Sequence, residues 1–203
     1  MPPVSLATAP GFADPVHDAQ RAFSALMWAM AEPGRVLPLA GGLSPPAPLA
    51  PELAAVALAL LDYETPFWLD PPLAARPEVA DFLRFHTGAP RAGEPAAARF
   101  AFCADGAGLP PFAAFAQGEP DDPDRSATLV VQVERFEAGP LALAGPGNAV
   151  PRGFGAVPLP HDFAARLAAN AAGFPLGVDL ILCAPGAVAA VPRTARPVAL
   201  PGA

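Results

Sequence analysis

Proline divides this chain into short segments and so limits the length of any helix or strand. The sequence contains 30 Pro and 18 Gly among 203 residues. Because proline lacks a backbone N–H and has a fixed φ, it suits loops and first helical turns but breaks element interiors. Four Pro lie within residues 41–51, which predicts a loop there. Pro51 and Pro77 each precede a helical pattern and stand where a helix can begin.

The segments between these breaks alternate between helical and strand patterns. Asp18 is a candidate N-cap for a first helix, which should end at Pro33-Gly34. Further helices are expected at residues 52–61, 77–86 and 161–172, the last with Phe163, Leu167 and Ala171 facing inward. Residues 106–124 are rich in breakers and are interpreted as a connection with a short helix near 112–116.

Short apolar runs predict the strands. They lie at residues 36–39, 65–69, 99–103, 128–133, 141–144, 178–183 and 187–191. The last two should form a hairpin, because Pro185-Gly186 between them suits a type II turn. Helices and strands in alternation favour an α/β fold, a mixed β-sheet flanked by helices, in which the hairpin supplies the antiparallel part. Phe67, Trp68 and Trp28 are interpreted as packing aromatics of an ordinary core.

Composition excludes several classes of function. All 12 basic residues are Arg, so no Lys can form a Schiff base with pyridoxal phosphate or hold a triphosphate in a Walker-A loop. The formal net charge is -7 and the pI about 4.8, whereas proteins that bind duplex nucleic acid normally present a basic face. We therefore expect no nucleic-acid partner.

No segment has the pattern of an export signal or a membrane span. Residues 1–10 carry no positive charge and no compact Leu-rich run. The longest apolar stretch, residues 49–61, contains Glu52 and falls short of the about 20 residues that a bilayer requires. These patterns predict a cytoplasmic protein without membrane association.

The sequence shows no recognisable catalytic or metal-binding set. His17, His86 and His161 are isolated from one another, and no Ser lies in a G-x-S-x-G motif. The acidic residues between 121 and 124 match no calcium loop and favour a solvated loop. Cys103 and Cys183 are interpreted as buried small hydrophobic residues. We expect no metal and no cofactor, and no catalytic residue is identified.

Two short polar motifs are candidate ligand-binding sites. Arg84, His86 and Thr87 stand at a predicted helix end, where they either bind an anion or cap the last carbonyl groups. Arg193 and Thr194 follow the predicted hairpin. Arg193 either contributes to an anion site or pairs with an acid such as Asp179, which needs a partner inside an apolar run.

A glycine-rich turn at residues 143–148 superficially suggests a phosphate loop. The dinucleotide fingerprint requires a third glycine where this chain has Val150, and Pro146 lacks a donor N–H. A tight turn at the end of a strand is therefore the favoured interpretation.

Six motifs in register cover nearly the whole chain and resemble one family. They are Asp18-Ala19-Gln20 with Ala29-Met30-Ala31-Glu32-Pro33-Gly34, Thr65-Pro66-Phe67-Trp68-Leu69, Arg84-Phe85-His86-Thr87-Gly88-Ala89-Pro90, Ser126-Ala127-Thr128-Leu129-Val130-Val131-Gln132-Val133, Phe174-Pro175-Leu176-Gly177-Val178-Asp179-Leu180, and Pro192-Arg193-Thr194. Together they resemble the H subunit of the bacterial carbon–phosphorus lyase system for phosphonate breakdown.

The resemblance implies a fold similar to the large domain of pyridoxal-phosphate (PLP)-dependent transferases, but without PLP. It also implies a homodimer that joins the G, I and J subunits of a core complex. That system is associated with formation of α-D-ribose 1-methylphosphonate 5-triphosphate from ATP and methylphosphonate, with chemistry assigned to subunits other than H. No catalytic residue of the H subunit is carried over to this chain.

These observations lead to one main hypothesis and two alternatives. The main hypothesis is a single H-subunit-like domain over residues 1–203 that acts as a non-catalytic accessory subunit. The first alternative is a free-standing homodimeric enzyme or binding protein for a small phosphate or phosphonate, with Arg84, His86 and Arg193 converging on the anion. The second is a homodimeric scaffold, which predicts an apolar surface patch.

Overall fold

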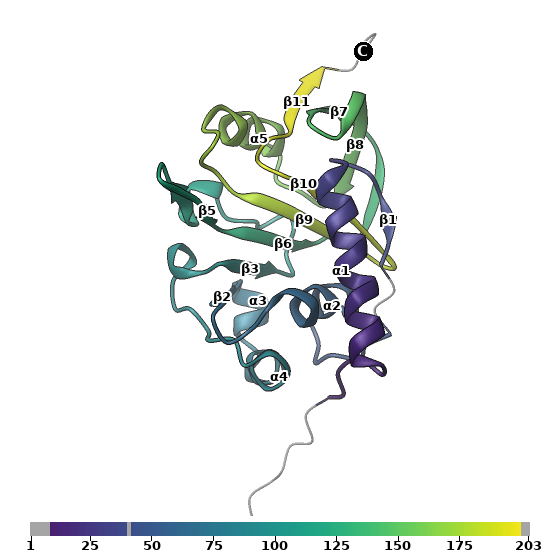
Figure 1. The fold of residues 1–203 in the computed structure, drawn as a ribbon, viewed down its shortest axis with the longest axis vertical. Coiled ribbons are helices and arrows are strands. Elements are labelled where there is room, and N and C mark those ends of the chain that lie inside the picture. Colours follow the sequence, from purple (N-terminus) through teal and green to yellow (C-terminus); the bar gives the residue numbers. More distant parts are fainter. Residues whose placement is uncertain (1–8, 40–41, 200–203) are drawn as a thin grey trace, which may run out of the picture.

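The computed structural model describes residues 9–39 and 42–199 (Figure 1). Residues 1–10, which the sequence predicts to lack an export signal, therefore lie mostly outside the described residues. The helices are α1 (Pro15–Ala31), α2 (Pro51–Leu60), α3 (Pro71–Ala74), α4 (Pro77–Thr87) and α5 (Phe163–Ala172), with 3₁₀ turns η1 (Pro95–Ala97) and η2 (Phe112–Ala114). The strands are β1 (Leu37–Pro38), β2 (Phe67–Leu69), β3 (Phe100–Cys103), β4 (Gln117–Glu119), β5 (Asp122–Ser126), β6 (Thr128–Gln132), β7 (Arg135–Gly145), β8 (Asn148–Val157), β9 (Asp179–Ala184), β10 (Ala187–Val191) and β11 (Arg196–Ala199).

A six-stranded mixed sheet forms the centre, in the order β1-β10-β9-β6-β3-β2. Strands β2, β3, β6 and β9 run parallel, and β10 is antiparallel to both of its neighbours. The predicted α/β class with a mixed sheet is confirmed. The predicted turn between β9 and β10 is also confirmed, because Gly186 has φ +70° as the second central position of a type II turn requires.

Both faces of this sheet are buried, which explains why its strands are continuous apolar runs rather than alternating ones. Val130 and Ile181 point to the face covered by α1, α2, α3 and α4. Leu129 and Val131 point to the opposite face, which α5, η2 and the β7–β8 hairpin cover. Figure 1 shows this division, with α1 to α4 on one side of the central strands and α5 on the other. Cys103 and Cys183 are free and buried, as predicted.

Pro51 and Pro77 begin α2 and α4 as expected, but the first helix starts earlier than predicted. Asp14, rather than Asp18, is its N-cap, and the Asp14 side chain accepts a hydrogen bond from the His17 backbone N–H. Asp18 lies in the first turn, where it accepts a bond from the Asp14 backbone N–H and complements the helix dipole. The Asp18 prediction was wrong because Pro15 itself can occupy the first helical position.

The largest unpredicted element is the second sheet, with the order β11-β7-β8. Only residues 141–144 of β7 were predicted, because Gly139-Pro140 has the pattern of a turn. The chain instead continues through this dipeptide with a shift of register between Glu137 and Leu141. A Cβ at Gly139 would collide with the Phe154 carbonyl oxygen, so glycine is required at this close approach. The edge strands β8 and β11 each tolerate a proline, since an edge strand leaves one row of N–H groups unpaired.

Three smaller differences concern local burial and pairing. The predicted connection at residues 106–124 contains β4 and pairs it with β5. On α5 the buried inward residue after Leu167 is Asn170, whereas Ala171 is half-buried. Phe67 is a core residue as interpreted, and Trp68 packs edge-on against Phe115. Trp28 is not a core residue, because half of its surface is exposed on the outer side of α1.

The described helices include none that could cross a membrane.

Candidate functional site

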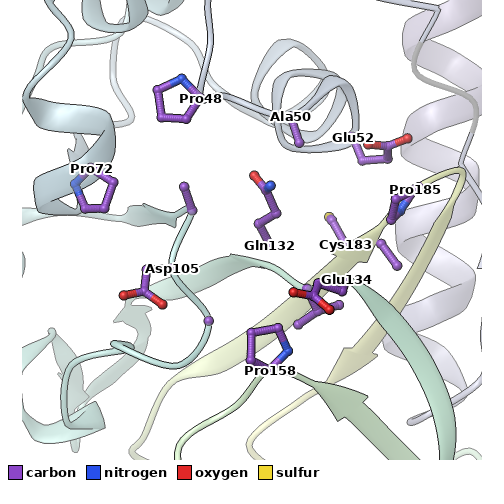
Figure 2. Close-up of a pocket in the computed structure, with 14 residues that line it drawn as sticks. Pro48, Ala50, Glu52, Pro72, Asp105, Gln132, Glu134, Pro158, Cys183 and Pro185 are labelled. Atoms are coloured by element: carbon purple, nitrogen blue, oxygen red, sulfur yellow. The ribbon is translucent and has the colours of Figure 1, made fainter.

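A pocket lies at the carboxyl ends of three neighbouring parallel strands, β3, β6 and β9 (Figure 2). Open α/β sheets commonly bind ligands in this position, because the loops that leave adjacent strands diverge there. We call it the strand-end pocket. Its volume is about 670 Å³. Its lining residues are Pro48, Ala50, Glu52, Pro72, Ala104, Asp105, Gly106, Gln132, Val133, Glu134, Pro158, Cys183, Ala184 and Pro185.

The fold builds this pocket from segments that are far apart in sequence. The start of α2 forms one wall, and the residues just after β3, β6 and β9 form the others (Figure 2). Gly106 allows the loop after β3 to pass close to the end of β6, because a Cβ there would meet the Gln132 and Pro158 carbonyl oxygens. The pocket therefore depends on the register of the sheet rather than on any local motif.

Acidic groups dominate the polar part of the strand-end pocket. Glu52 Oε1 accepts a hydrogen bond from the Gly186 backbone N–H at 2.7 Å, which ties α2 to the β9–β10 turn. Asp105 Oδ1 accepts one from the Gly108 N–H at 3.0 Å, and Glu134 is exposed at the rim. No Arg, Lys or His is among the lining residues.

Asp70 extends this acidic character beneath the pocket. It is buried directly after β2, and its two carboxylate oxygens accept hydrogen bonds from the backbone N–H groups of Leu73 and Asp105. Burial raises the pKa of Asp70, the nearby charge of Asp105 adds to the increase, and the backbone hydrogen bonds partly offset it. Asp70 thus joins the start of α3 to the loop after β3.

The strand-end pocket lacks the groups that a nucleophilic enzyme requires. Burial raises the pKa of the Cys183 thiol, and the charge of Glu52 raises it further, so the thiol stays protonated at neutral pH. No His lines the pocket to act as its base. Within residues 9–39 and 42–199, no group of three or more His, Cys, Asp or Glu side chains is arranged to hold a metal ion.

Arg84, His86 and Thr87 lie in the last turns of α4, as predicted, but their side chains do different things. His86 Nε2 lies 2.9 Å from the Ala9 carbonyl oxygen, and its ring packs edge-on against Phe82. The Thr87 hydroxyl donates to the Leu83 carbonyl at 2.7 Å, which is a capping contact within the helix. Arg84 is exposed and lines a separate shallow pocket beside α3 and α4.

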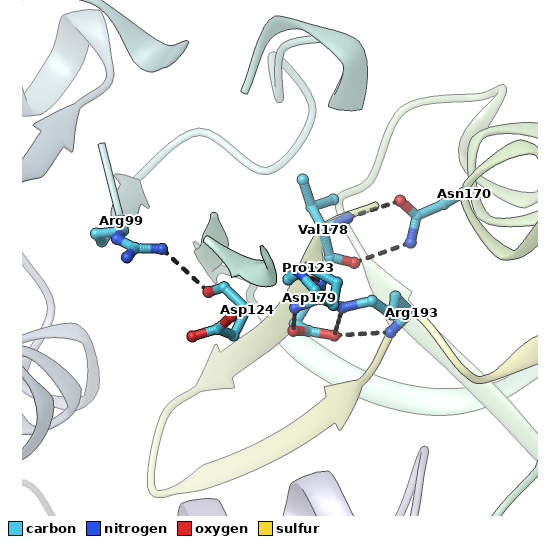
Figure 3. Close-up of polar contacts among 7 residues, drawn as sticks. All are labelled: Arg99, Pro123, Asp124, Asn170, Val178, Asp179 and Arg193. Carbon is cyan, nitrogen blue, oxygen red and sulfur yellow. Dashed lines mark hydrogen bonds and ion pairs between the residues drawn. The ribbon is translucent and has the colours of Figure 1, made fainter. Parts of the chain in front are cut away.

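Arg193 and Thr194 lie elsewhere, beyond the amino end of β9 (Figure 3). The Arg193 guanidinium forms an ion pair with Asp179, and its Nη1 donates to the Pro123 carbonyl at 2.6 Å. The Arg193 backbone N–H also donates to Asp179 Oδ1 at 2.8 Å. The pairing alternative considered for Arg193 is therefore observed. Thr194 lines a small pocket with Phe174 and Arg196.

The structure does not bring the two predicted groups together. The α4 group lies on the face of the sheet covered by α1 to α4, and its pocket shares no residue with the pocket that Arg193 and Thr194 line. The convergent anion site of Arg84, His86 and Arg193 is thus not formed within this chain. Any separate ligand contact by these residues stays a prediction.

The glycine-rich turn joins β7 and β8. Asn148 Nδ2 donates to the carbonyl oxygens of Pro33 and Leu143, at 2.9 and 3.1 Å. A Cβ at Gly147 would collide with the Ala31 carbonyl oxygen, so the turn packs against the end of α1. It is a tight turn at the end of a strand, as favoured.

Sequence reasoning missed every polar residue of the strand-end pocket. Each one is unremarkable in its own segment, since Glu52 begins a helix, Gln132 ends a strand and Glu134 precedes another. The available signal was that the predicted strands 99–103, 128–133 and 178–183 would place their carboxyl ends together if they were parallel neighbours.

The architecture defines a mixed α/β protein whose main pocket lies at the carboxyl ends of parallel strands and is acidic. The chain belongs to the family of bacterial phosphonate metabolism protein PhnH, whose model matches residues 10–197.

Two relatives are similar over most of their length. One is the alpha-D-ribose 1-methylphosphonate 5-triphosphate synthase subunit PhnH of Rhizobium meliloti (strain 1021), which is 45% identical over 188 residues, or 91% of this chain and 92% of the relative. The other is HtxG of Stutzerimonas stutzeri, named as a candidate C-P lyase subunit, which is 37% identical over 176 residues, or 86% of this chain and 83% of the relative.

Proposed function

We propose that this chain is an accessory, non-catalytic subunit of a carbon–phosphorus lyase system, required for forming α-D-ribose 1-methylphosphonate 5-triphosphate from ATP and methylphosphonate. The observation that carries the proposal is the family match over residues 10–197. The relative from Rhizobium meliloti is itself named as a subunit of the synthase, and the similarity covers 92% of its length.

The chemistry of the pocket supports a non-catalytic role. Its thiol is buried and protonated at neutral pH, and its lining has neither a base for that thiol nor a cation for a phosphate. A triphosphate or phosphonate substrate would meet Glu52, Asp105 and Glu134, whose negative charges would repel it. Substrate chemistry is therefore assigned to other subunits.

Assembly with other protein is the second part of the proposal. We propose a homodimer that joins the G, I and J subunits of the core complex. In support, Val16, Phe23, Met27 and Trp28 are each at least half exposed on the outer side of α1, a set we call the α1 outer face. Large apolar side chains gathered on one exposed helix are typical of interaction surfaces.

Co-purification with tagged protein tests the assembly. The tagged chain should recover its G, I and J homologues from cells grown without phosphate, and Phe23→Glu/Trp28→Glu should reduce that recovery. Tyr63→Glu, at an exposed aromatic residue outside α1, is the matched control and should leave recovery unchanged. Recovery of this chain alone, while the other subunits co-purify with one another, would refute the proposed function. Full recovery with the double variant would refute only the α1 outer face.

The alternative, a free-standing phosphate- or phosphonate-binding protein, has less support because Arg84 and Arg193 lie apart and Arg193 is already paired. Calorimetry with ATP and with methylphosphonate separates the two functions. We expect no saturable heat from the isolated chain, whereas tight saturable binding of either compound would favour the alternative.

We further propose a related fold, a single domain and a cellular compartment for this chain. The fold is related to the large domain of PLP-dependent transferases, with the cofactor chemistry excluded by the absence of lysine. Residues 1–203 form one H-subunit-like domain, which is supported by two core clusters packed on the same central sheet. The protein works in the cytoplasm, without a membrane or nucleic-acid partner.

A further inference from the structure

Two arginines without an acid partner in the described residues line one pocket beside α3 and α4. The chain has 19 acidic residues for 12 arginines, so an arginine normally has a carboxylate available. Within the described residues, ion pairs to Asp or Glu are formed by Arg21, Arg35, Arg76, Arg125, Arg135, Arg152, Arg166 and Arg193. The remaining four include Arg99, which donates to the Asp124 carbonyl oxygen at 3.0 Å, and Arg196, which lines other pockets. Arg84 and Arg91 are left together in one pocket, which indicates a surface that is positive toward a partner.

Both cations stand on backbone that the fold holds in place. Arg84 lies in the last turns of α4, where the helix dipole favours a positive charge. Arg91 lies after α4 in a segment that pairs with the edge strand β2. There the Phe67 N–H donates to the Pro90 carbonyl at 3.0 Å, and the Ala92 N–H donates to the Phe67 carbonyl at 2.7 Å. The Cα positions of the two arginines are therefore set by a helix and a sheet edge rather than by a free loop.

We call this space the two-arginine pocket. Its volume is about 410 Å³, and its other lining residues are Ala74, Pro77, Ala80, Asp81 and Pro90. One carboxylate, that of Asp81, stands against two guanidinium groups, so the lining carries one excess positive charge. The lining runs along α4 from Pro77 to Arg84, which is about 10 Å at the rise of an α-helix. That length exceeds a single phosphate or carboxylate group and corresponds to about three residues of extended chain.

We propose that the two-arginine pocket binds an acidic segment of another subunit of the core complex. One Glu or Asp side chain of that segment pairs with Arg84, a second pairs with Arg91, and an apolar side chain packs on Pro77 and Pro90. The planar fork of Arg matches a carboxylate, and exposed Arg beside apolar surface is typical of protein–protein interfaces. The inference rests on the proposed accessory-subunit function and adds a contact separate from the α1 outer face, since no lining residue belongs to α1.

The absence of lysine from this chain allows a direct test by cross-linking. Arg84→Lys and Arg91→Lys each introduce one side-chain amine, which a zero-length carbodiimide reagent couples to a carboxylate in salt-bridge contact with it. The tagged variants are purified from cells grown without phosphate, coupled, digested and analysed by mass spectrometry. We expect links from positions 84 and 91 to Asp or Glu of a G, I or J homologue. Arg125→Lys is the matched control and should link only within the chain, because Arg125 is exposed and already paired with Asp122.

The outcomes separate this inference from the proposed function. Recovery of the other subunits without such links would overturn the inference and leave the proposed function intact. Links from positions 84 and 91 only to Asp81, or only to a second copy of this chain, would overturn it in the same way. Recovery of no other subunit by the wild-type chain would refute the proposed function and the inference together.

Charge reversal measures how much the two arginines contribute. Arg84→Glu/Arg91→Glu should reduce recovery of the other subunits about tenfold, because like charges then face each other across the interface. Arg125→Glu/Arg135→Glu changes the net charge equally at exposed arginines that are already paired, and should leave recovery unchanged. Arg84→Lys/Arg91→Lys keeps both charges and should retain most of the recovery. Equal losses in the two charge-reversed variants would overturn the inference, because net charge would then explain both.

Discussion

At the start of β9, the Asp179 carboxylate is paired with Arg193, and the amide of Asn170 bonds to both backbone groups of Val178. At the other end of the parallel strands, Gln132 Oε1 has no hydrogen-bond partner within the described residues. Three carboxyl groups line the pocket there, and no Arg, Lys or His side chain does. At the amino end an acid is paired with a cation, whereas at the carboxyl end Glu52, Asp70 and Asp105 bond to backbone N–H groups and no basic side chain lines the pocket. Figures 2 and 3 show these two ends.

The first and largest test removes the ion pair at the amino end. Asp179→Ala should lower the free energy of unfolding by about 3 kcal/mol, because it leaves the Arg193 charge without its partner. Both side chains are mostly buried, with 13% and 15% of their surfaces exposed, so solvent screens the pair little. Urea denaturation measures the change, and Asp122→Ala, at an exposed pair with Arg125, is the matched control. A loss no greater than in the control would contradict a structural role for Asp179.

The second test removes the neighbouring amide. Asn170→Ala should cost about 2 kcal/mol, because the Val178 N–H and carbonyl oxygen both lose their partner in a buried position. Gln20→Ala, on the exposed side of α1, is the control and should change stability little. If the two variants unfold at the same urea concentration, then the connection between α5 and β9 does not depend on this amide.

A third test uses pH to probe the buried carboxyl group of Asp70, directly after β2. Since burial raises the pKa of Asp70 above its ordinary value of 3.8, the folded chain holds this proton more tightly than the unfolded chain. The contribution of Asp70 to stability is therefore largest at low pH and falls as pH rises from 3.8 through the folded-state pKa. Asp70→Asn cannot titrate, so wild-type stability relative to this variant should fall across that window.

Urea denaturation of both proteins at intervals between about pH 3.5 and 7 measures this difference. Asp81→Asn, on the exposed surface of α4, controls for the general effect of removing a carboxylate. A difference that rises with pH would mean that Asp70 is stabilised in its charged form, as paired acids are.

The smallest effect is expected at the buried side-chain oxygen of Gln132, which has no hydrogen-bond partner within the described residues. Gln132→Leu should change the free energy of unfolding by no more than about 0.5 kcal/mol, because the buried oxygen has no bond to lose and its removal relieves an unsatisfied group. A loss of stability as large as that of Asn170→Ala would show that Gln132 is structural, and the contrast between the two ends would fail.

Local signals were enough to predict much of the fold. Pro51 and Pro77 mark helix starts because an initial helical position needs no N–H, and Pro185-Gly186 marks the turn between β9 and β10. Local signals failed where tertiary contacts override them. Gly139-Pro140 has the pattern of a break, but a register shift against β8 carries β7 through it. Asn170 resembles a polar surface residue, but the Val178 backbone supplies partners that allow its burial.

The candidate site was less predictable than the fold. Arg84 and Arg193 were grouped because both suit an anion, but sequence contains no measure of the distance between α4 and the end of β10. Arg193 was also correctly given Asp179 as an alternative partner, since a carboxylate in an apolar run needs a charge nearby. No local signal marked the pocket residues, because their proximity depends on how the strands that they follow pair with one another.

By itself, the sequence determined the α/β class, the family resemblance and the exclusion of Schiff-base chemistry, because proline positions, apolar periodicity and the absence of lysine are properties of the chain alone. Only the tertiary structure decided which polar groups are paired and which face an open pocket. The reason is that the strand-end pocket joins residues from Pro48 to Pro185, and the parallel register of β3, β6 and β9 brings them together.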